Sequence, residues 1–146
     1  MKKAVTGAIL IGATVLGIGF IWHMVHGISL FARVDYGDKN TNTHSEADIR
    51  EAVSIARKQF RDFEGCVMTE IHYDEALSRE ESDTVQRQGF SSLGTGFDDV
   101  IYLESTFLTD SPFASDMWNH CKQSGYGWII TQSPENGWEF RTAGYA

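Results

Sequence analysis

The sequence contains few of the residues that mark specialised structural classes. Its 146 residues include only 2 cysteines, 2 prolines and 14 glycines, and 22% of them are charged. These proportions exclude disulfide-dense, collagen-like and coiled-coil proteins. The composition is that of one modest globular domain.

Charge is missing from the first part of the chain and strongly negative in the rest. No Asp, Glu, Lys or Arg occurs between Ala4 and Ala32, so the first 32 residues carry +2 from Lys2 and Lys3. All 20 acidic residues follow, against 10 bases, which gives residues 33–146 a formal charge of −10. Such a surface repels phosphate, so nucleic acid is excluded as a partner.

The charge-free stretch predicts a membrane segment. Residues 4–22 are almost wholly apolar and number about 19, the length that a helix needs to cross the hydrocarbon core of a bilayer. Residues 1–32 are therefore interpreted as a transmembrane anchor or signal segment. A cleaved signal peptide stays open as the alternative, because Val25-His26-Gly27 loosely resembles a cleavage site.

The flanks of this segment predict its orientation. Lys2 and Lys3 favour a cytoplasmic N-terminus, so we expect a single-pass protein of the cell membrane with its C-terminal domain outside the cytoplasm. If the segment is cleaved, the protein is secreted. Small residues four apart offer a face for pairing of two helices, and hence a homo-oligomer: Ala4, Ala8 and Gly12, then Ala13 and Gly17.

After residues 33–44, a polar stretch interpreted as a linker, the chain takes up a helical pattern. Ser45 is a typical helix N-cap residue. Apolar residues then recur at steps of three and four up to Phe63, which predicts an amphipathic helix that ends near Gly65. The polar side of this helix carries Arg57, Lys58 and Arg61.

Residues 45–146 are predicted to form one α+β domain. Alternating apolar residues predict strands at residues 66–73, 100–108, 126–132 and 138–143, and the last two form a hairpin. A capping-box spacing at Ser78 predicts a short polar helix that stops at Gly89. An amphipathic helix packed on a curved antiparallel sheet satisfies this order of elements, as in NTF2-like and cystatin-like folds.

Several of these segments resemble a group of known sequences. Residues 65–75, Asp98-Asp99-Val100, Trp128-Ile129-Ile130 and residues 137–145 are similar to stretches of small, uncharacterised extracytoplasmic domains of Gram-positive bacteria. The resemblance covers about 100 residues. It implies a lipoprotein or a single anchor that carries an NTF2-like domain, and it implies no substrate. This chain departs from the group because its first cysteine is Cys66, far from the apolar segment.

The densest polar cluster lies at the end of the first predicted strand: Glu70, His72, Asp74 and Glu75. On a strand, residues 70, 72 and 74 point to one face, which they share with Cys66 and Met68. A carboxylate beside an imidazole can serve as an acid–base pair or as metal ligands. The alternative is a strand end that simply reaches solvent.

Aromatic residues supply candidate walls for a ligand pocket between helix and sheet: Tyr73, Tyr102, Trp128 and Trp138. A second apolar group occupies the long connection after the second predicted strand: Phe113, Met117 and Trp118. This group either packs on the core or lines the mouth of a pocket.

Cys66 and Cys121 are a candidate disulfide, because an extracytoplasmic location permits one bridge. The alternative is an ordinary buried thiol at Cys66. Cys121 and the neighbouring His120 supply two local ligands at most, which is too few for a zinc site. We therefore predict neither a metal nor another cofactor.

These features favour a membrane-anchored extracytoplasmic module that binds a small ligand or an envelope protein. The alternative is a small extracytoplasmic enzyme in which His72 acts with Glu70 or Asp74.

Overall fold

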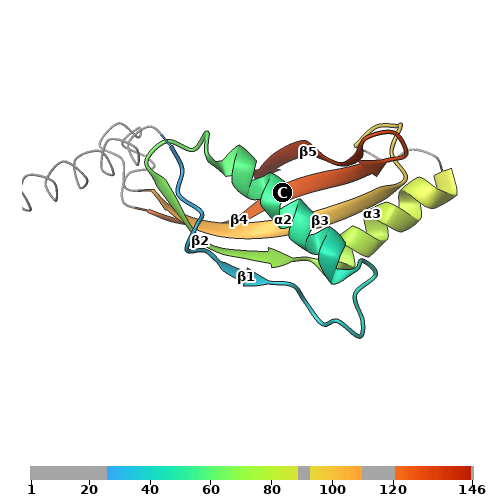
Figure 1. The fold of residues 1–146 in the computed structure, drawn as a ribbon, viewed down its shortest axis with the longest axis horizontal. Helices are drawn as coiled ribbons and strands as arrows, with labels where there is room; N and C mark the ends of the chain where they lie inside the picture. The colour runs from blue at the N-terminus through green and yellow to red at the C-terminus, as the bar shows by residue number, and fades with distance from the viewer. Residues whose placement is uncertain (1–25, 89–92, 110–120, 146) are drawn as a thin grey trace, which may run out of the picture.

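The computed structural model describes residues 26–88, 93–109 and 121–145, which form an α+β domain around a five-stranded sheet (Figure 1). The elements are β1 (Arg33–Asp35), α2 (Glu46–Phe60), β2 (Cys66–Tyr73), α3 (Glu75–Gln88), β3 (Asp99–Thr109), β4 (Lys122–Ser133) and β5 (Gly137–Tyr145). The strands lie side by side in chain order, and α2 crosses one face of the sheet. The predicted α+β class is confirmed.

The sheet is mixed, whereas the sequence predicts an antiparallel one. Strands β2 to β5 pair antiparallel, and β4 and β5 form the predicted hairpin. Strand β1, however, pairs parallel with β2, with Arg33 opposite Glu70 and Asp35 opposite His72. Because β1 is a three-residue edge strand that is largely exposed, it shows no apolar alternation in the sequence. Residues 33–44, predicted to be a linker, therefore contribute to the sheet.

The described domain includes residues before β1 as well. The Gly27 N–H donates to the Arg61 carbonyl at 3.0 Å, and Ile28 forms a parallel bridge with Val67. A Cβ at Gly27 would lie 2.1 Å from the carbonyl oxygen of Phe60, so only glycine permits this approach. Residues 26–32, assigned to the membrane segment because they lack charge, pack beside the end of α2.

The other predictions for the N-terminal segment fall outside the described residues. The apolar stretch 4–22 and its small-residue face are not described, and neither are Phe113, Met117 and Trp118. Within the described ranges, no helix has both the length and the apolar character needed to span a bilayer.

Helix α2 forms as its sequence predicts. The Ser45 hydroxyl accepts a hydrogen bond from the Asp48 N–H at 3.2 Å, which confirms the predicted N-cap. The helix ends at Phe60, earlier than predicted. Its buried stripe packs on the sheet and forms one side of the main core: Ile49, Ala52, Val53, Ala56 and Phe60.

A β-bulge in β2 changes the face on which its side chains lie. The register with β3 shifts between Met68 and Glu70, and the extra residue reverses the alternation at this point. Met68 is buried in the main core and Cys66 packs against that core, whereas Glu70 and His72 alternate with buried Ile71 and so face away from α2. The prediction that Cys66 and Met68 share a face with Glu70 and His72 is therefore wrong.

Helix α3 begins at Glu75, before the predicted start at Ser78. The Asp74 carboxylate accepts a hydrogen bond from the Leu77 N–H at 3.0 Å, so Asp74 caps the helix. Ser78, predicted to be the cap, is fully buried instead.

The buried serines of α3 bind the backbone of β3. The hydroxyl of Ser78 accepts from the Tyr102 N–H at 2.8 Å, and that of Ser82 accepts from the Val100 N–H at 3.1 Å. Strand β2 ends opposite Leu103, so β3 has no neighbouring strand on its β2 side before that residue. The two serine hydroxyls accept hydrogen bonds from the β3 N–H groups that β2 leaves unpaired there. Behind them a second, smaller core contains Val85, Phe97 and Val100.

Candidate functional site

The predicted polar cluster is distributed among separate interactions. Glu70 forms an ion pair with Arg33 at 2.8 Å, and Asp74 caps α3. His72 lies in register between Asp35 of β1 and Glu104 of β3, on the face opposite to α2. Across the described residues, no group of three or more His, Cys, Asp or Glu side chains is placed to hold a metal ion.

The four predicted pocket walls lie on both faces of the sheet. Tyr73, Trp128 and Trp138 belong to the main core beneath α2, where Trp128 is fully buried. Their space is filled by packing: the Trp128 ring lies 6.2 Å from that of Phe60, and its indole N–H donates to the Ser105 hydroxyl at 2.8 Å. These three aromatic residues therefore stabilise the core rather than line one shared cavity.

Tyr102 lies on the opposite face, where it lines a hollow of about 330 Å³. Its hydroxyl lies over Gly127, where an added Cβ would approach it to 2.1 Å. Burial raises the pKa of Tyr102, and the nearby carboxylates of Glu104 and Asp74 add to this effect.

The candidate disulfide between Cys66 and Cys121 is not formed. Cys66 lies opposite Thr109 of β3, and the Thr109 N–H donates to the Cys121 carbonyl at 2.9 Å from the other side. The backbones at Cys66 and Cys121 are therefore two strand spacings apart, and each spacing is about 4.8 Å. Their separation exceeds the ~7 Å between Cα atoms that a disulfide can span. Burial raises the pKa of the Cys66 thiol, which suits the alternative of a buried thiol.

A buried chain of hydrogen bonds surrounds His44 and combines two residues from different predicted sites, Tyr73 and Glu75, with two that were not predicted, His44 and Asp99. The His44 ring is 3% exposed; its Nδ1 lies 2.7 Å from the Tyr73 hydroxyl and its Nε2 lies 3.0 Å from Oδ1 of Asp99. The Tyr73 hydroxyl in turn donates to Glu75 at 2.7 Å. We call Asp99, His44, Tyr73 and Glu75 the polar relay.

The members of the polar relay are held by further hydrogen bonds. The Glu75 carboxylate accepts from the Tyr73 hydroxyl, from the N–H and hydroxyl of Thr43, and from Arg79. The Asp99 carboxylate also accepts from the Ser82 hydroxyl at 2.6 Å. Each nitrogen of the His44 ring therefore has an oxygen partner that is itself held in place by other groups.

The two carboxylates of the polar relay are held in the ionised form. Burial alone would raise the pKa of Glu75, but the hydrogen bonds from Tyr73, Thr43 and Arg79 outweigh it and lower that pKa to about 2. Burial alone would also raise the pKa of Asp99, but the hydrogen bonds from His44 and Ser82 outweigh burial and lower that pKa. The pKa of Tyr73 is raised, first by burial and then by its bond to Glu75.

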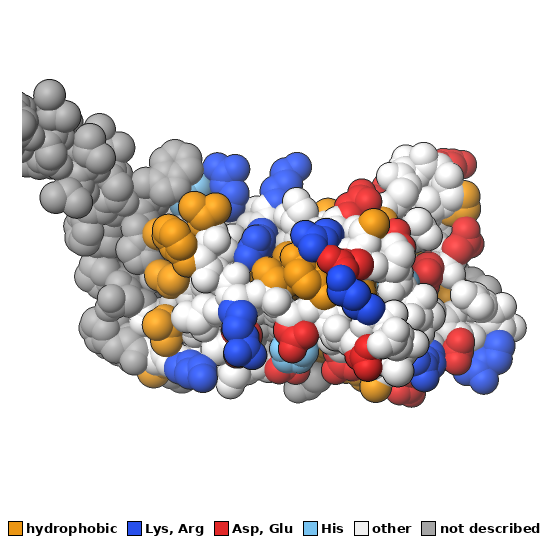
Figure 2. All heavy atoms as spheres, turned by 60° about the horizontal axis from the view of Figure 1, so that its bottom comes forward, with side chains coloured by type: hydrophobic (Ala, Val, Ile, Leu, Met, Phe, Trp, Pro, Cys, Tyr) orange, Lys and Arg blue, Asp and Glu red, His pale blue; other side chains and the backbone are white. Residues whose placement is uncertain are grey.

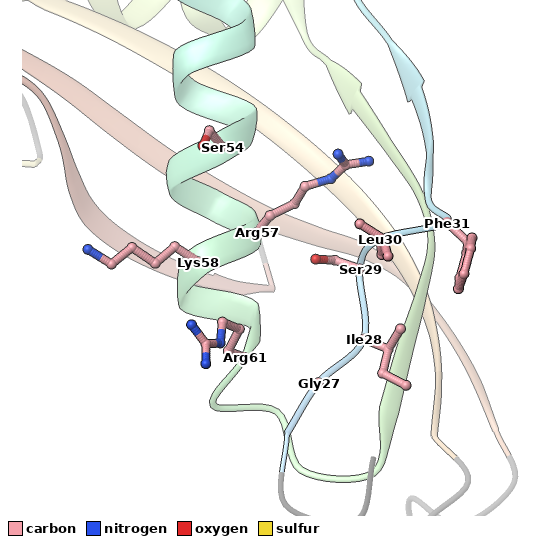
Figure 3. Close-up of a pocket in the computed structure, with 9 residues that line it drawn as sticks. All are labelled: Gly27, Ile28, Ser29, Leu30, Phe31, Ser54, Arg57, Lys58 and Arg61. Atoms are coloured by element: carbon pink, nitrogen blue, oxygen red, sulfur yellow. The ribbon is translucent and has the colours of Figure 1, made fainter. Parts of the chain in front are cut away.

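A second hollow, lined by described residues, lies at the other end of α2. It measures about 610 Å³ and runs between residues 27–31 and the C-terminal half of the helix (Figure 3). We call it the basic groove. Basic side chains line it on the helix side: Arg57, Lys58 and Arg61.

The rim of the basic groove is apolar. Leu30 is 78% exposed and Phe31 is 84% exposed, the highest exposures among the large hydrophobic residues that the structure describes. In Figure 2, hydrophobic and several basic side chains gather toward the left end of the view, whereas acidic side chains lie mainly over the right half. The face shown there is therefore polarised from one end to the other.

Sequence reasoning missed both features for identifiable reasons. His44 falls in the polar stretch taken as a linker, where nothing in the residue pattern marks a buried ring. The basic groove combines residues 27–31 with helix residues 54–61, and only the cluster of Arg57, Lys58 and Arg61 within five residues hinted at it.

Comparisons with protein-family models, with curated proteins and with solved structures find no match for this chain.

Proposed function

We propose that this protein is a membrane-anchored extracytoplasmic binding module whose basic groove faces the bilayer. Residues 4–22 are the anchor, with Lys2 and Lys3 on the cytoplasmic side. The described domain then lies outside the cytoplasm, and α2 packed across its sheet supports an NTF2-like or cystatin-like arrangement.

The observation that carries this proposal is that the basic groove begins within a few residues of the predicted anchor along the chain. His26, the first described residue, is four residues after Trp22, and four residues span at most ~14 Å. Gly27 is bonded to Arg61 and belongs to the groove itself. An anchor that ends near Trp22 thus keeps this end of the domain close to the membrane surface.

The opposite end of the domain is the part available to an envelope protein or a small ligand. It carries α3, whose exposed face is rich in acidic residues, and the acidic side chains visible in Figure 2. A partner with a basic or polar surface fits this end, because a negatively charged partner is repelled.

Cell fractionation tests the proposal. We expect the chain to keep residues 1–25, to remain in the membrane pellet after extraction at alkaline pH, and to lose its domain to protease added outside intact cells or spheroplasts. A soluble chain whose N-terminus begins near Gly27, or a domain protected from external protease, contradicts it.

A further inference from the structure

We propose that the basic groove binds the headgroup phosphate of an anionic phospholipid in the bilayer from which the chain emerges. This inference rests on the proposed membrane anchoring and adds a ligand class to it. The groove volume of about 610 Å³ lies within the ~300–1,000 Å³ that small-molecule sites commonly have.

Charge complementarity is the first support. Residues 33–146 carry a formal charge of −10, yet no acidic residue occurs between Glu51 and Asp62 of the chain, where Arg57, Lys58 and Arg61 all lie. An acidic domain is repelled by an anionic membrane surface unless a basic part faces that surface. The basic groove is the part that does so when the chain leaves the bilayer near Trp22.

The guanidinium of Arg57 is already oriented for an anion. One of its terminal nitrogens donates to the Ala32 carbonyl at 3.0 Å, which holds the side chain across the groove. Its Nε is buried and has no hydrogen-bond partner in the structure, and the side chain forms no ion pair with a described carboxylate. A guanidinium fixed in this way can donate two parallel hydrogen bonds to a phosphate.

The opposite wall supplies a hydroxyl and a short apolar segment. In Figure 3, Arg57 extends from α2 toward the chain that follows Phe31, and the Ser29 side chain points back toward the helix. The Lys58 and Arg61 side chains lie on the other side of the helix in this view. Leu30 and Phe31 follow directly and are exposed. Apolar side chains next to basic ones are the pattern by which proteins settle into the headgroup and acyl boundary of a bilayer.

The proposal thus commits to a bilayer lipid rather than to a free phosphate compound. The basic side chains bind the phosphate, while Leu30 and Phe31 contact the upper part of the acyl chains. Both contacts are made at once only if the phosphate belongs to a lipid.

Binding of short-chain lipids to the purified full chain in detergent tests the inference. The probes are dioctanoyl phosphatidylglycerol, dioctanoyl phosphatidylcholine and glycerol phosphate. Titration calorimetry and native mass spectrometry measure the binding of each probe. We expect phosphatidylglycerol to bind at least about tenfold more tightly than either of the other probes, because each basic residue near a membrane surface adds ~1 kcal/mol of attraction to anionic lipid.

Two matched double variants locate the site. Arg57→Gln with Lys58→Gln should weaken phosphatidylglycerol binding about tenfold, whereas Lys39→Gln with Arg50→Gln, which removes the same charge at the other end of α2, should leave it within about twofold. Lys39 and Arg50 both pair with Glu46, and neither lines the groove. Circular dichroism and thermal unfolding confirm that each variant is folded.

The possible outcomes separate this inference from the proposed function. Equal binding of the three probes, or equal effects of the two double variants, overturns the lipid site. If the chain nevertheless stays in the membrane after alkaline extraction, the anchored module stands without it. A chain released by alkali overturns both, because the lipid site is then no longer held at a bilayer.

Discussion

At the N-terminal end of α2 the charged groups pair with one another inside the fold, whereas at its C-terminal end Arg57 and Lys58 form no ion pair with a described carboxylate. The polar relay gives Glu75 four donors and gives each nitrogen of His44 an oxygen partner. The basic groove combines cations with exposed Leu30 and Phe31. One end thus uses charge to hold the fold together, and the other presents charge to its surroundings.

This difference has an energetic reason. A buried charge is costly unless it is paired and hydrogen-bonded, so removing a member of the polar relay should destabilise the domain. An exposed cation in water needs no partner and contributes little to stability. Substitutions at the two ends should therefore affect different properties, stability at the polar relay and binding at the basic groove.

The largest expected effect comes from His44→Ala. Removing the His44 ring leaves the Asp99 carboxylate and the Tyr73 hydroxyl without their buried partner, and removing the partner of a buried charge costs about 3–5 kcal/mol. Asp99 is 27% exposed, so we expect the lower part of this range. Denaturant unfolding of the full chain in detergent measures the change.

His72→Ala is the matched control for this variant. His72 lies on the face away from α2 and is only partly buried, so its removal should change the free energy of unfolding by about 0.5 kcal/mol or less. If the two histidine variants destabilise the domain equally, the polar relay does not hold the fold together.

The next largest effect is the loss of folding stability in acid that protonation of Glu75 causes. Its pKa is lowered to about 2 in the folded state from 4.5, so its contribution is complete above pH ~4.5 and is lost as the pH falls toward 2. Glu75→Gln should reduce stability at neutral pH by about 2 kcal/mol, since it weakens hydrogen bonds to a charged group. It should also flatten the loss of stability in acid.

Unfolding curves measured between pH 7 and pH ~2.5 test this prediction. Glu70→Gln provides the comparison, because Glu70 pairs with the exposed Arg33 and such surface pairs contribute about 0–1 kcal/mol. The residual slope of Glu75→Gln should reflect Asp99, whose pKa is lowered as well. An unchanged acid slope in Glu75→Gln contradicts the pairing of Tyr73 with Glu75.

The smallest effect is expected at the wall of the basic groove. Gly27→Ala places a methyl group 2.1 Å from the Phe60 carbonyl oxygen, and the chain has to move away from α2 at a cost of about 1–2 kcal/mol. Thermal unfolding measures the loss, and lipid binding should weaken with it because the groove changes shape. Gly144→Ala is the control, since nothing lies within 4 Å of its added Cβ.

Most of the secondary structure was predictable from the residue pattern because it depends on local chemistry. The apolar spacing and the cap at Ser45 predict α2, and period-two alternation predicts β2 to β5. The edge strand β1 was not predictable, because three exposed residues carry no alternation. The face of β2 on which Glu70 lies was not predictable. The bulge between Met68 and Glu70 reverses the alternation of side chains, and it depends on pairing with β3.

The candidate sites were much harder to predict than the elements. Of the four aromatic residues predicted to line one pocket, Tyr73, Trp128 and Trp138 fill the core beneath α2 and Tyr102 lies on the other face, because composition does not distinguish a filled core from a cavity. The polar relay joins residues 44, 73, 75 and 99, and the basic groove joins residues 27–31 to residues 54–61. Each site depends on segments that no local pattern relates.

The sequence by itself determined the charge asymmetry, the apolar stretch at residues 4–22, and the amphipathic helix and strands of an α+β domain, since these follow from residue type and spacing. Only the tertiary structure decided that residues 26–44 pack against the domain, that the His44 ring is buried between Tyr73 and Asp99, and that Arg57 and Lys58 at the C-terminal end of α2 form no ion pair with a described carboxylate. The physical reason is that a buried polar group takes whatever partner the fold brings within hydrogen-bond distance, and distance along the chain does not predict that partner.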